Sequence, residues 1–320
     1  MNRDLVRYPD FDDPHAYTLR KLWTLYRVDT SGIGNLTEVG YRGYPDPLFE
    51  DDDDSRYTPD FLSIGEDGNA QIVDVKGFEN IEEYLNGRSE VEEKIKEVIE
   101  DLEKYDDVTP LMVSEYLSMH GITYEPDHHE LVVLLPHEVY TRYESTIVNA
   151  ADSVGLRVWV IDQNSAEHLW LAHGDHKSQV LTNYIERGSG RGVQLYQGGK
   201  DLLPFVRDTD KDIVRFYFVA NITAYCSQRR KLEFQFDEID DILVNEQRPK
   251  MFRHLPPSER EDSWKDCIRQ MRDRFGLISR TTAIQDTYKW EKTRFLTQPR
   301  DRSRILKNVG DELGVFVGDE

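Results

Sequence analysis

The chain has 320 residues, of which 38% are hydrophobic and 11% aromatic, so it is too apolar for a disordered protein and long enough for two domains. No apolar run approaches the roughly 18 residues of a membrane span, and the N-terminal residues lack the apolar core of a secretory signal. Two cysteines, Cys226 and Cys267, exclude a disulfide framework and a four-cysteine zinc site. We therefore expect a soluble, cytoplasmic protein without a membrane segment.

The charge is strongly negative and unevenly distributed. The 61 acidic residues outnumber 40 basic ones, for a formal charge of −21, and the basic residues comprise 26 Arg and 14 Lys. This composition resembles that of halophilic proteins, in which salt screens the surface self-repulsion; an acidic protein of a non-halophile is the alternative. Residues 1–225 carry a net −22 and residues 226–310 a net +5, so the later segment is a candidate for binding a polyanion.

The first part of the chain alternates patterns typical of helices and strands, which predicts an α/β domain. Helical spacing of apolar residues, or a capping Thr-Pro pair, predicts helices over residues 14–28, 89–105, 109–121 and 136–154. Apolar runs predict strands over residues 36–42, 57–64, 70–78, 129–135 and 156–161. The turn sequence GEDGN predicts a hairpin between the second and third of these strands, and the last two flank a helix as in a parallel crossover.

The second part begins after a glycine-rich polar stretch. Helical patterns over residues 210–228, 236–245 and 257–275 precede a hairpin formed by residues 276–283 and 287–295. Three helices followed by a β-hairpin are typical of a winged helix. We therefore divide the chain into a first domain, a linker, a winged-helix domain and an acidic tail, at residues 1–186, 187–207, 208–300 and 301–320.

The strongest local motif is Pro59-Asp60, followed after thirteen residues by Asp74-Val75-Lys76. If Asp60 begins one strand of the hairpin and Asp74 ends the other, antiparallel pairing brings the two carboxylates to the same end of the sheet. Side chains alternate along a strand, so Asp74 and Lys76 point to the same face. Two carboxylates suit a hard cation such as Mg²⁺, and a nearby lysine can polarise water for phosphodiester hydrolysis.

This motif resembles that of the PD-(D/E)xK nuclease superfamily. The segments RYTPDFLSI and IVDVKG are most similar to the endonuclease subunits that cut transposon ends and carry a C-terminal winged helix, with archaeal Holliday-junction resolvases second. The resemblance implies a restriction-endonuclease-like mixed sheet flanked by helices. It also implies a Mg²⁺-dependent endodeoxyribonuclease, with Mn²⁺ as a substitute, in which Asp60, Asp74 and the Val75 carbonyl hold the metal and Lys76 positions water.

Relatives of this kind often add an acidic residue upstream of the motif. Glu38 is the candidate here, because a strand beside the hairpin would aim its side chain at the metal; an exposed strand glutamate is the alternative. The chain departs from the commoner pattern in carrying Asp74 where Glu is frequent. Aspartate still fits the pattern, with a side chain one methylene shorter.

Basic residues recur on the third helix and the hairpin of the winged-helix domain. The expected DNA contacts are Lys265, Arg269, Arg272, Arg280, Lys289 and Lys292. The alternative is a helix whose cations pair with the acids interspersed among them. The expected partners are DNA and, in a recombination or transposition complex, another protein; a homodimer also stays open.

Two further interpretations complete the prediction. The histidines His168, His173 and His176, like the pair at residues 128–129, fit surface positions better than a metal cluster, because their spacing matches no helical pair of ligands. The alternative to an endonuclease acting in transposition, recombination or viral and plasmid DNA processing is a non-catalytic DNA-binding regulator or assembly protein that retains a nuclease-like fold. A Lys76 that points away from the carboxylates would favour this alternative.

Overall fold

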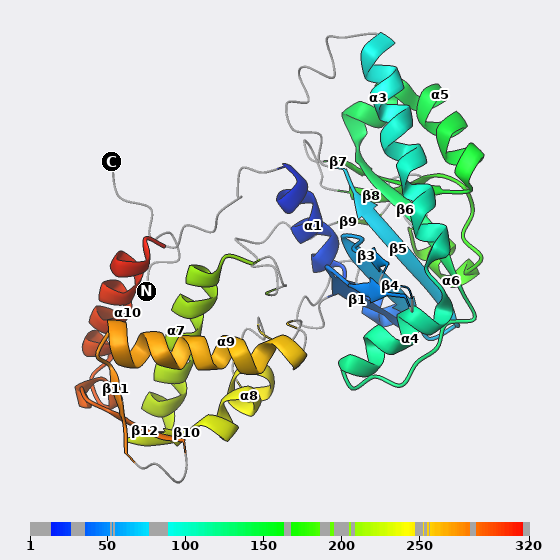
Figure 1. Cartoon of the computed structure of the whole chain (residues 1–320). Helices are drawn as coiled ribbons and strands as arrows, with labels where there is room; N and C mark the ends of the chain where they lie inside the picture. The colour runs from blue at the N-terminus through cyan, green and yellow to red at the C-terminus, as the bar shows by residue number, and fades with distance from the viewer. Residues whose placement is uncertain are drawn as a thin grey trace. The chain divides into compact units, whose positions relative to one another are not determined.

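The computed structural model describes residues 14–26, 36–51, 53, 55–76, 89–162, 168–185, 193–194, 205, 209–246, 252, 255, 257–281 and 286–315. The chain separates into two compact units, one formed by residues 10–203 and the other mainly by residues 204–320 (Figure 1). Within the described residues, no helix is long and apolar enough to cross a membrane.

The first unit is built on a seven-stranded mixed sheet. The strands follow one another across the sheet as β1 (Tyr41–Pro45), β4 (Phe61–Gly65), β5 (Asn69–Val75), β6 (His128–Pro136), β7 (Arg157–Asp162), β8 (His168–His173) and β9 (Val193–Gln194). Strands β5, β6 and β7 are parallel, and the other neighbours are antiparallel. The predicted hairpin is β4–β5, and the predicted crossover is β6–α5–β7, where α5 spans His137–Val154. A short ribbon of β2 (Phe49–Glu50) and β3 (Arg56–Tyr57) precedes β4.

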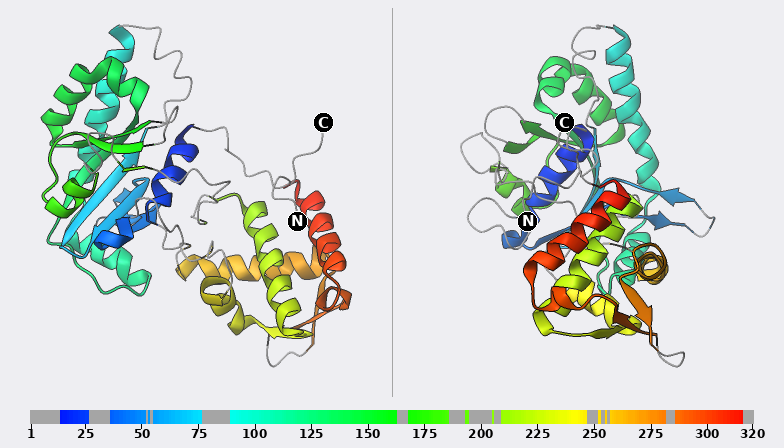
Figure 2. Two further views of the ribbon diagram at one scale, coloured as in Figure 1. Left: turned by 180° about the vertical axis from the view of Figure 1, so that it is seen from behind. Right: turned by 90° about the vertical axis from the view of Figure 1, so that its left-hand side faces the viewer.

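Helices cover both faces of this sheet, as Figures 1 and 2 show. On one face lie α3 (Ser89–Glu100), the short helix η3 (Asp101–Asp107), α4 (Pro110–Met119) and α5. On the other lie α1 (Pro14–Thr24), η2 (Leu36–Val39) and α6 (Gln179–Ile185). Because side chains alternate along each strand, Ile72 packs on the α3 side while Val73 packs on the α1 side. The predicted α/β architecture, a mixed sheet flanked by helices, is confirmed.

Local sequence signals set the ends of the helices in this unit. The Thr109 hydroxyl accepts a hydrogen bond from the Met112 N–H at 3.2 Å, and Pro110 occupies the first turn of α4, as the sequence predicted. Gly155 ends α5 in the left-handed conformation, at a φ of 69°, which a side chain would disfavour. The chain can therefore leave α5 directly into β7.

The second unit combines helices with a three-stranded antiparallel sheet. Its elements are α7 (Lys211–Arg229), β10 (Glu233–Gln235), η4 (Phe236–Glu238), α8 (Ile239–Asp241), η5 (Ile242–Glu246), α9 (Pro257–Arg269), η7 (Gln270–Arg274), β11 (Ile278–Arg280), β12 (Thr287–Trp290), η8 (Arg294–Leu296) and α10 (Pro299–Leu313). The strand order is β10-β12-β11. The three expected helical regions and the hairpin strands are present, and residues 282–285, between the two strands in sequence, lie outside the described residues.

Three expectations need correction. Residues 36–42 do not form one strand, because η2 precedes β1. Within the expected linker, Val193 and Gln194 pair with β8, and Phe205 is buried against Phe252. The expected acidic tail begins instead with α10, which buries Ile305, Leu306, Val309 and Leu313 and packs on α7. Apolar residues at helical spacing, rather than the acidic composition around them, decide the structure of this segment.

Candidate functional site

The β4–β5 hairpin brings Asp60 and Asp74 together. Phe61 pairs with Val73, so Asp60 and Asp74 occupy the next positions on the two antiparallel segments. The Val75 N–H donates a hydrogen bond of 2.6 Å to Asp60 Oδ2, while His15 Nε2, on α1, lies 3.1 Å from Asp60 Oδ1. The Asp60 carboxylate is therefore fixed by the backbone beside Asp74.

Lys76 leaves β5 toward the same carboxylates. Its backbone N–H donates to Leu134 O at 3.0 Å, which continues the pairing with β6, and its ammonium contacts Asp74 Oδ2. Asp74 is 8% exposed, whereas Lys76 and Asp60 are 28% and 23% exposed. The cluster is thus buried on the Asp74 side and open to solvent along Asp60 and Lys76, where a phosphate could approach.

Tyr105 completes this group, and no pattern in the sequence marks it as a site residue. The residue is buried on η3, and its hydroxyl lies 3.2 Å from Thr58 O and 3.4 Å from Asp74 Oδ1. A hydroxyl has one proton, so only one of these oxygens accepts a full hydrogen bond from it at a time. Burial and the nearby charges of Asp74 and Asp60 raise the pKa of Tyr105, which keeps this proton in place.

The electrostatics of the group favour an added positive charge. Burial, followed by the like charge of Asp60, raises the pKa of Asp74 above the usual value of an aspartate, although Lys76 acts in the opposite direction. Two carboxylates held together in this way repel each other, and a cation placed between them would relieve that repulsion. The Lys76 ammonium supplies only part of the compensation.

The donor set fits a hard, oxygen-preferring cation. No cluster of three or more His, Cys, Asp or Glu side chains suited to a metal occurs in the part of the chain that the structure describes. A cation at Asp60 and Asp74 would therefore take its remaining ligands from the main chain, water and a phosphate. Mg²⁺ binds in this manner, through one or two carboxylates with several waters and substrate phosphates. The Val75 carbonyl stays a prediction as a third protein ligand.

Glu38 does not join the group, contrary to the expectation from its position before the motif. Tyr41 pairs with Gly65 and Pro45 pairs with Phe61, so the start of β1 lies at the end of the hairpin away from Asp60. Tyr41 and Pro45, at the two ends of β1, are separated by roughly 14 Å at about 3.4 Å per residue. Glu38 is on η2, before even the start of β1, and its side chain is exposed.

The histidine prediction also needs correction, because His176 is fully buried rather than on the surface. Trp159 Nε1–H donates to His176 Nε2 at 2.8 Å, so His176 Nδ1–H donates to Glu130 Oε2 at 2.9 Å. Glu130 also accepts from the Lys177 N–H at 2.9 Å and lies 3.2 Å from Arg157. Burial alone would raise the pKa of Glu130, but these partners lower it below its usual value. This cluster anchors residues 176–177 to the sheet near the start of β6.

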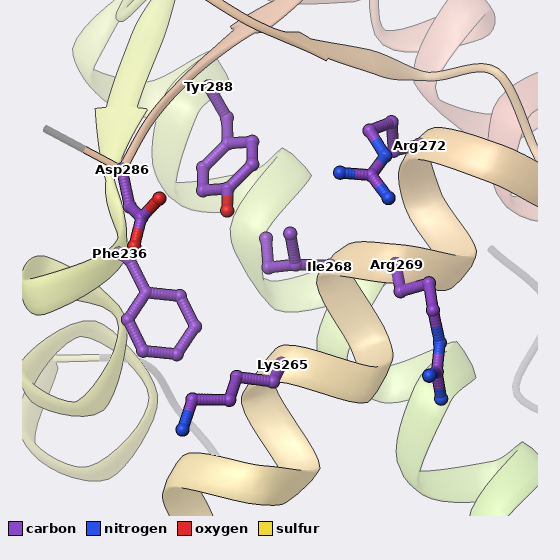
Figure 3. Close-up of a pocket in the computed structure, with 7 residues that line it drawn as sticks. All are labelled: Phe236, Lys265, Ile268, Arg269, Arg272, Asp286 and Tyr288. Atoms are coloured by element: carbon purple, nitrogen blue, oxygen red, sulfur yellow. The ribbon is translucent and has the colours of Figure 1, made fainter. Parts of the chain in front are cut away.

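Four of the six residues predicted to contact DNA lie at or beside one pocket of the second unit. Lys265, Arg269 and Arg272 are exposed on one face of α9 and η7, and they line a pocket together with Asp286 and Tyr288 (Figure 3). Arg280 lies opposite Tyr288 in the hairpin and pairs with Asp286 at the edge of this pocket.

The other two predicted contacts are exposed elsewhere on the hairpin. Lys289 adjoins Tyr288 in β12 and so points to the opposite face of the sheet, and Lys292 follows the strand. Arg260, another basic residue of α9, is buried and donates to Leu255 O at 2.7 Å, so it serves the core.

The alternative of cations paired with neighbouring acids is also visible on α9. Lys265 lies 2.7 Å from Glu261, Arg269 pairs with Asp266, and Arg272 contacts Asp273 at 2.6 Å. These pairs lie on the helix surface, where water and salt weaken them. They therefore leave the cations able to exchange a carboxylate for a phosphate.

Comparisons with known proteins identify no relative of this chain. A scan against protein-family models, a search of curated proteins and a search of solved structures each returned no match to this chain. The geometry of the residues themselves therefore carries the functional argument.

Proposed function

We propose that the chain is a metal-dependent DNA endonuclease of the PD-(D/E)xK type, which hydrolyses phosphodiester bonds with Mg²⁺ or Mn²⁺. The observation that carries the proposal is the meeting of Asp60, Asp74 and Lys76 at one end of β4 and β5, with the ammonium of Lys76 against Asp74. A structural ion pair needs one acid and one base. A second carboxylate beside the first costs free energy, because the two negative charges repel each other unless a bound cation or substrate group offsets them.

Each residue then has a definable part in hydrolysis. Asp60 and Asp74 would hold the metal, which when bound supplies positive charge to the phosphate and lowers the pKa of water. Lys76 is placed to orient the attacking water and to donate a hydrogen bond to a phosphate oxygen through its exposed side. Tyr105 holds the Asp74 carboxylate in position through Oδ1. His15 and the Val75 N–H do the same for Asp60.

The second unit supports the DNA part of the proposal. Its order α7, β10, α8, α9, β11 and β12, with the strand order β10-β12-β11, agrees with the order expected of a winged helix, and on this basis we infer that the unit is one. In such a domain the third helix would enter the major groove and the hairpin would contact flanking phosphates. Helix α9 would be the recognition helix, with Lys265, Arg269 and Arg272 toward DNA.

The direction of Lys76 also favours the enzyme over a non-catalytic DNA-binding protein. Charge attraction alone can hold Lys76 against Asp74, but DNA binding by itself does not require a lysine and two carboxylates to meet at one end of a sheet. The Lys76–Asp74 contact and the retained Asp60 are the features that hydrolysis requires and that DNA binding alone does not.

Plasmid cleavage tests the proposal. The full chain, in buffer with KCl, should nick or linearise supercoiled DNA in Mg²⁺ or Mn²⁺ and not in EDTA. Asp74→Ala and Lys76→Ala should each lower the rate at least roughly 100-fold, the scale of losing one strong charge-stabilising interaction. Both should keep the affinity of the parent for DNA, measured by fluorescence anisotropy in EDTA.

Two surface variants serve as matched controls. Asp152→Ala and Lys96→Ala remove exposed partners of simple ion pairs on α5 and α3, and both should cleave at the parent rate. Cleavage that survives in both Asp74→Ala and Lys76→Ala, with the metal still required, would place the active site elsewhere.

A further inference from the structure

The pocket beside α9 has a composition that phosphate contacts alone do not explain. It has a volume of about 160 Å³ and lies between α9 with η7 and the residues Phe236, Asp286 and Tyr288 (Figure 3). Ile268 and Tyr288 are 4% and 6% exposed, and Phe236 is half-buried. The floor is therefore apolar and largely aromatic, while its rim is charged.

Two cationic side chains, Lys265 and Arg272, lie at opposite ends of this apolar floor. In Figure 3 the Lys265 ammonium extends toward Phe236, the Arg272 guanidinium points toward Tyr288, and Arg269 extends away from both rings. Asp286 and the Tyr288 hydroxyl add an acceptor and a donor at the edge. An aromatic floor with a cation at each end matches a flat aromatic group that carries negative charge on both sides.

The size of the pocket narrows the choice of ligand. Pockets for free cofactors and drug-sized molecules usually measure roughly 300–1,000 Å³, well above this one. One planar ring system fits, while a complete dinucleotide does not. A base inside a duplex is covered on both faces by its neighbours, whereas an unpaired base exposes a face that can stack on an aromatic side chain.

We propose that this pocket holds one unpaired base of a DNA strand, stacked on Phe236, with the flanking phosphates on Lys265 and Arg272. The inference rests on the proposed DNA binding and narrows its substrate to DNA with an unpaired nucleotide, as found at a frayed end, a tail or a junction. The surface pairs of Lys265 with Glu261 and of Arg272 with Asp273 are exposed and weak, so both cations can contact the phosphates instead.

Two DNAs of the same duplex sequence, one blunt and one with a short single-stranded tail, test the inference with the full chain in EDTA. The tailed DNA should bind more tightly by roughly 5- to 150-fold, the range that one base stacked on an aromatic residue supplies. A 2-aminopurine in the tail should lose fluorescence on binding, because stacking quenches it.

Variants of the pocket should separate stacking from charge. Phe236→Leu keeps an apolar side chain but no ring, so it should abolish the preference for the tail and the quenching, while Phe236→Trp should retain both. Lys265→Gln and Arg272→Gln should each reduce the salt dependence of binding by about one ion. Leu232→Ala, which removes an exposed apolar side chain of the same unit outside the pocket, is the control and should change neither property.

The outcomes distinguish this inference from the proposed function. Equal affinity for the two DNAs, or a tail preference that survives Phe236→Leu, would overturn the base pocket and leave duplex binding and cleavage standing. Failure to bind either DNA would overturn the DNA role of this unit together with the pocket.

Discussion

Replacing Asp74 with asparagine should make the protein more stable while it destroys cleavage. Burial and the neighbouring Asp60 raise the pKa of Asp74, so the native state binds this proton more tightly than the unfolded state does. Stability contributed by this group is therefore full below the pKa of the unfolded chain and declines as pH rises through the higher native pKa. At neutral pH the ionised carboxylate lowers the free energy of unfolding, and a neutral amide of the same shape removes that cost.

The stabilisation expected of Asp74→Asn is small. Relief of an unfavourable functional group commonly raises the free energy of unfolding by about 1 kcal/mol. For a unit of this length that corresponds to a melting temperature about 2–4 °C higher, measured by calorimetry in EDTA at pH 7. The cleavage rate should fall at least roughly 100-fold, because asparagine supplies neither the charge nor the second oxygen to a metal.

The same melting experiment with added Mg²⁺ measures whether Asp74 helps to bind the metal. Mg²⁺ at a hundredfold excess over its dissociation constant should stabilise the parent by about 2.7 kcal/mol, and Asp74→Asn should lose most of that gain. Asp152→Asn, at an exposed acid, should behave as the parent in every respect. The reasoning fails if Asp74→Asn is less stable than the parent in EDTA and is still stabilised by Mg²⁺ to the same degree.

Two further substitutions and a salt series test the charges and the strand register. Glu130→Gln should lower the free energy of unfolding by about 1–3 kcal/mol at neutral pH. Because the native pKa of Glu130 is lowered, this difference from the parent should shrink as the pH falls below about 4, and a difference that stays constant would contradict a stabilising role for the ionised Glu130. Glu38→Ala should cleave DNA at the parent rate, since this side chain is exposed at the other end of the hairpin, and a large loss of activity would contradict that placement. Thermal melting should rise as KCl approaches molar concentrations, because salt screens the net charge of −21, and greatest stability at low salt would refute the halophilic interpretation.

The sequence predicted best what depends on neighbouring residues. The β4–β5 hairpin, the β6–α5–β7 crossover and the start of α4 follow from turn residues, apolar periodicity and a capping Thr-Pro pair, all within short stretches. Asp60, Asp74 and Lys76 could be placed together because they belong to that hairpin. The alternation of strand side chains then fixed which of them share a face.

What could not be predicted depends on contacts between distant segments. Tyr105 reaches Asp74 across 31 positions of sequence and His15 reaches Asp60 across 45, and no periodicity marks either residue. His176 meets Glu130 across 46 positions, so its burial was missed. The prediction for Glu38 was wrong for a local reason. The strand was expected to begin five residues before β1 does, and the short helix η2 occupies most of those residues instead.

The hydrogen bond from the Val75 N–H to Asp60 has a consequence for how the sequence can vary. Because a main-chain group holds the carboxylate, the identity of the Val75 side chain is set only by the apolar layer under α1, where it is buried. Isoleucine or leucine should therefore be tolerated between the aspartate and the lysine. Proline should not, since it lacks the N–H that orients Asp60.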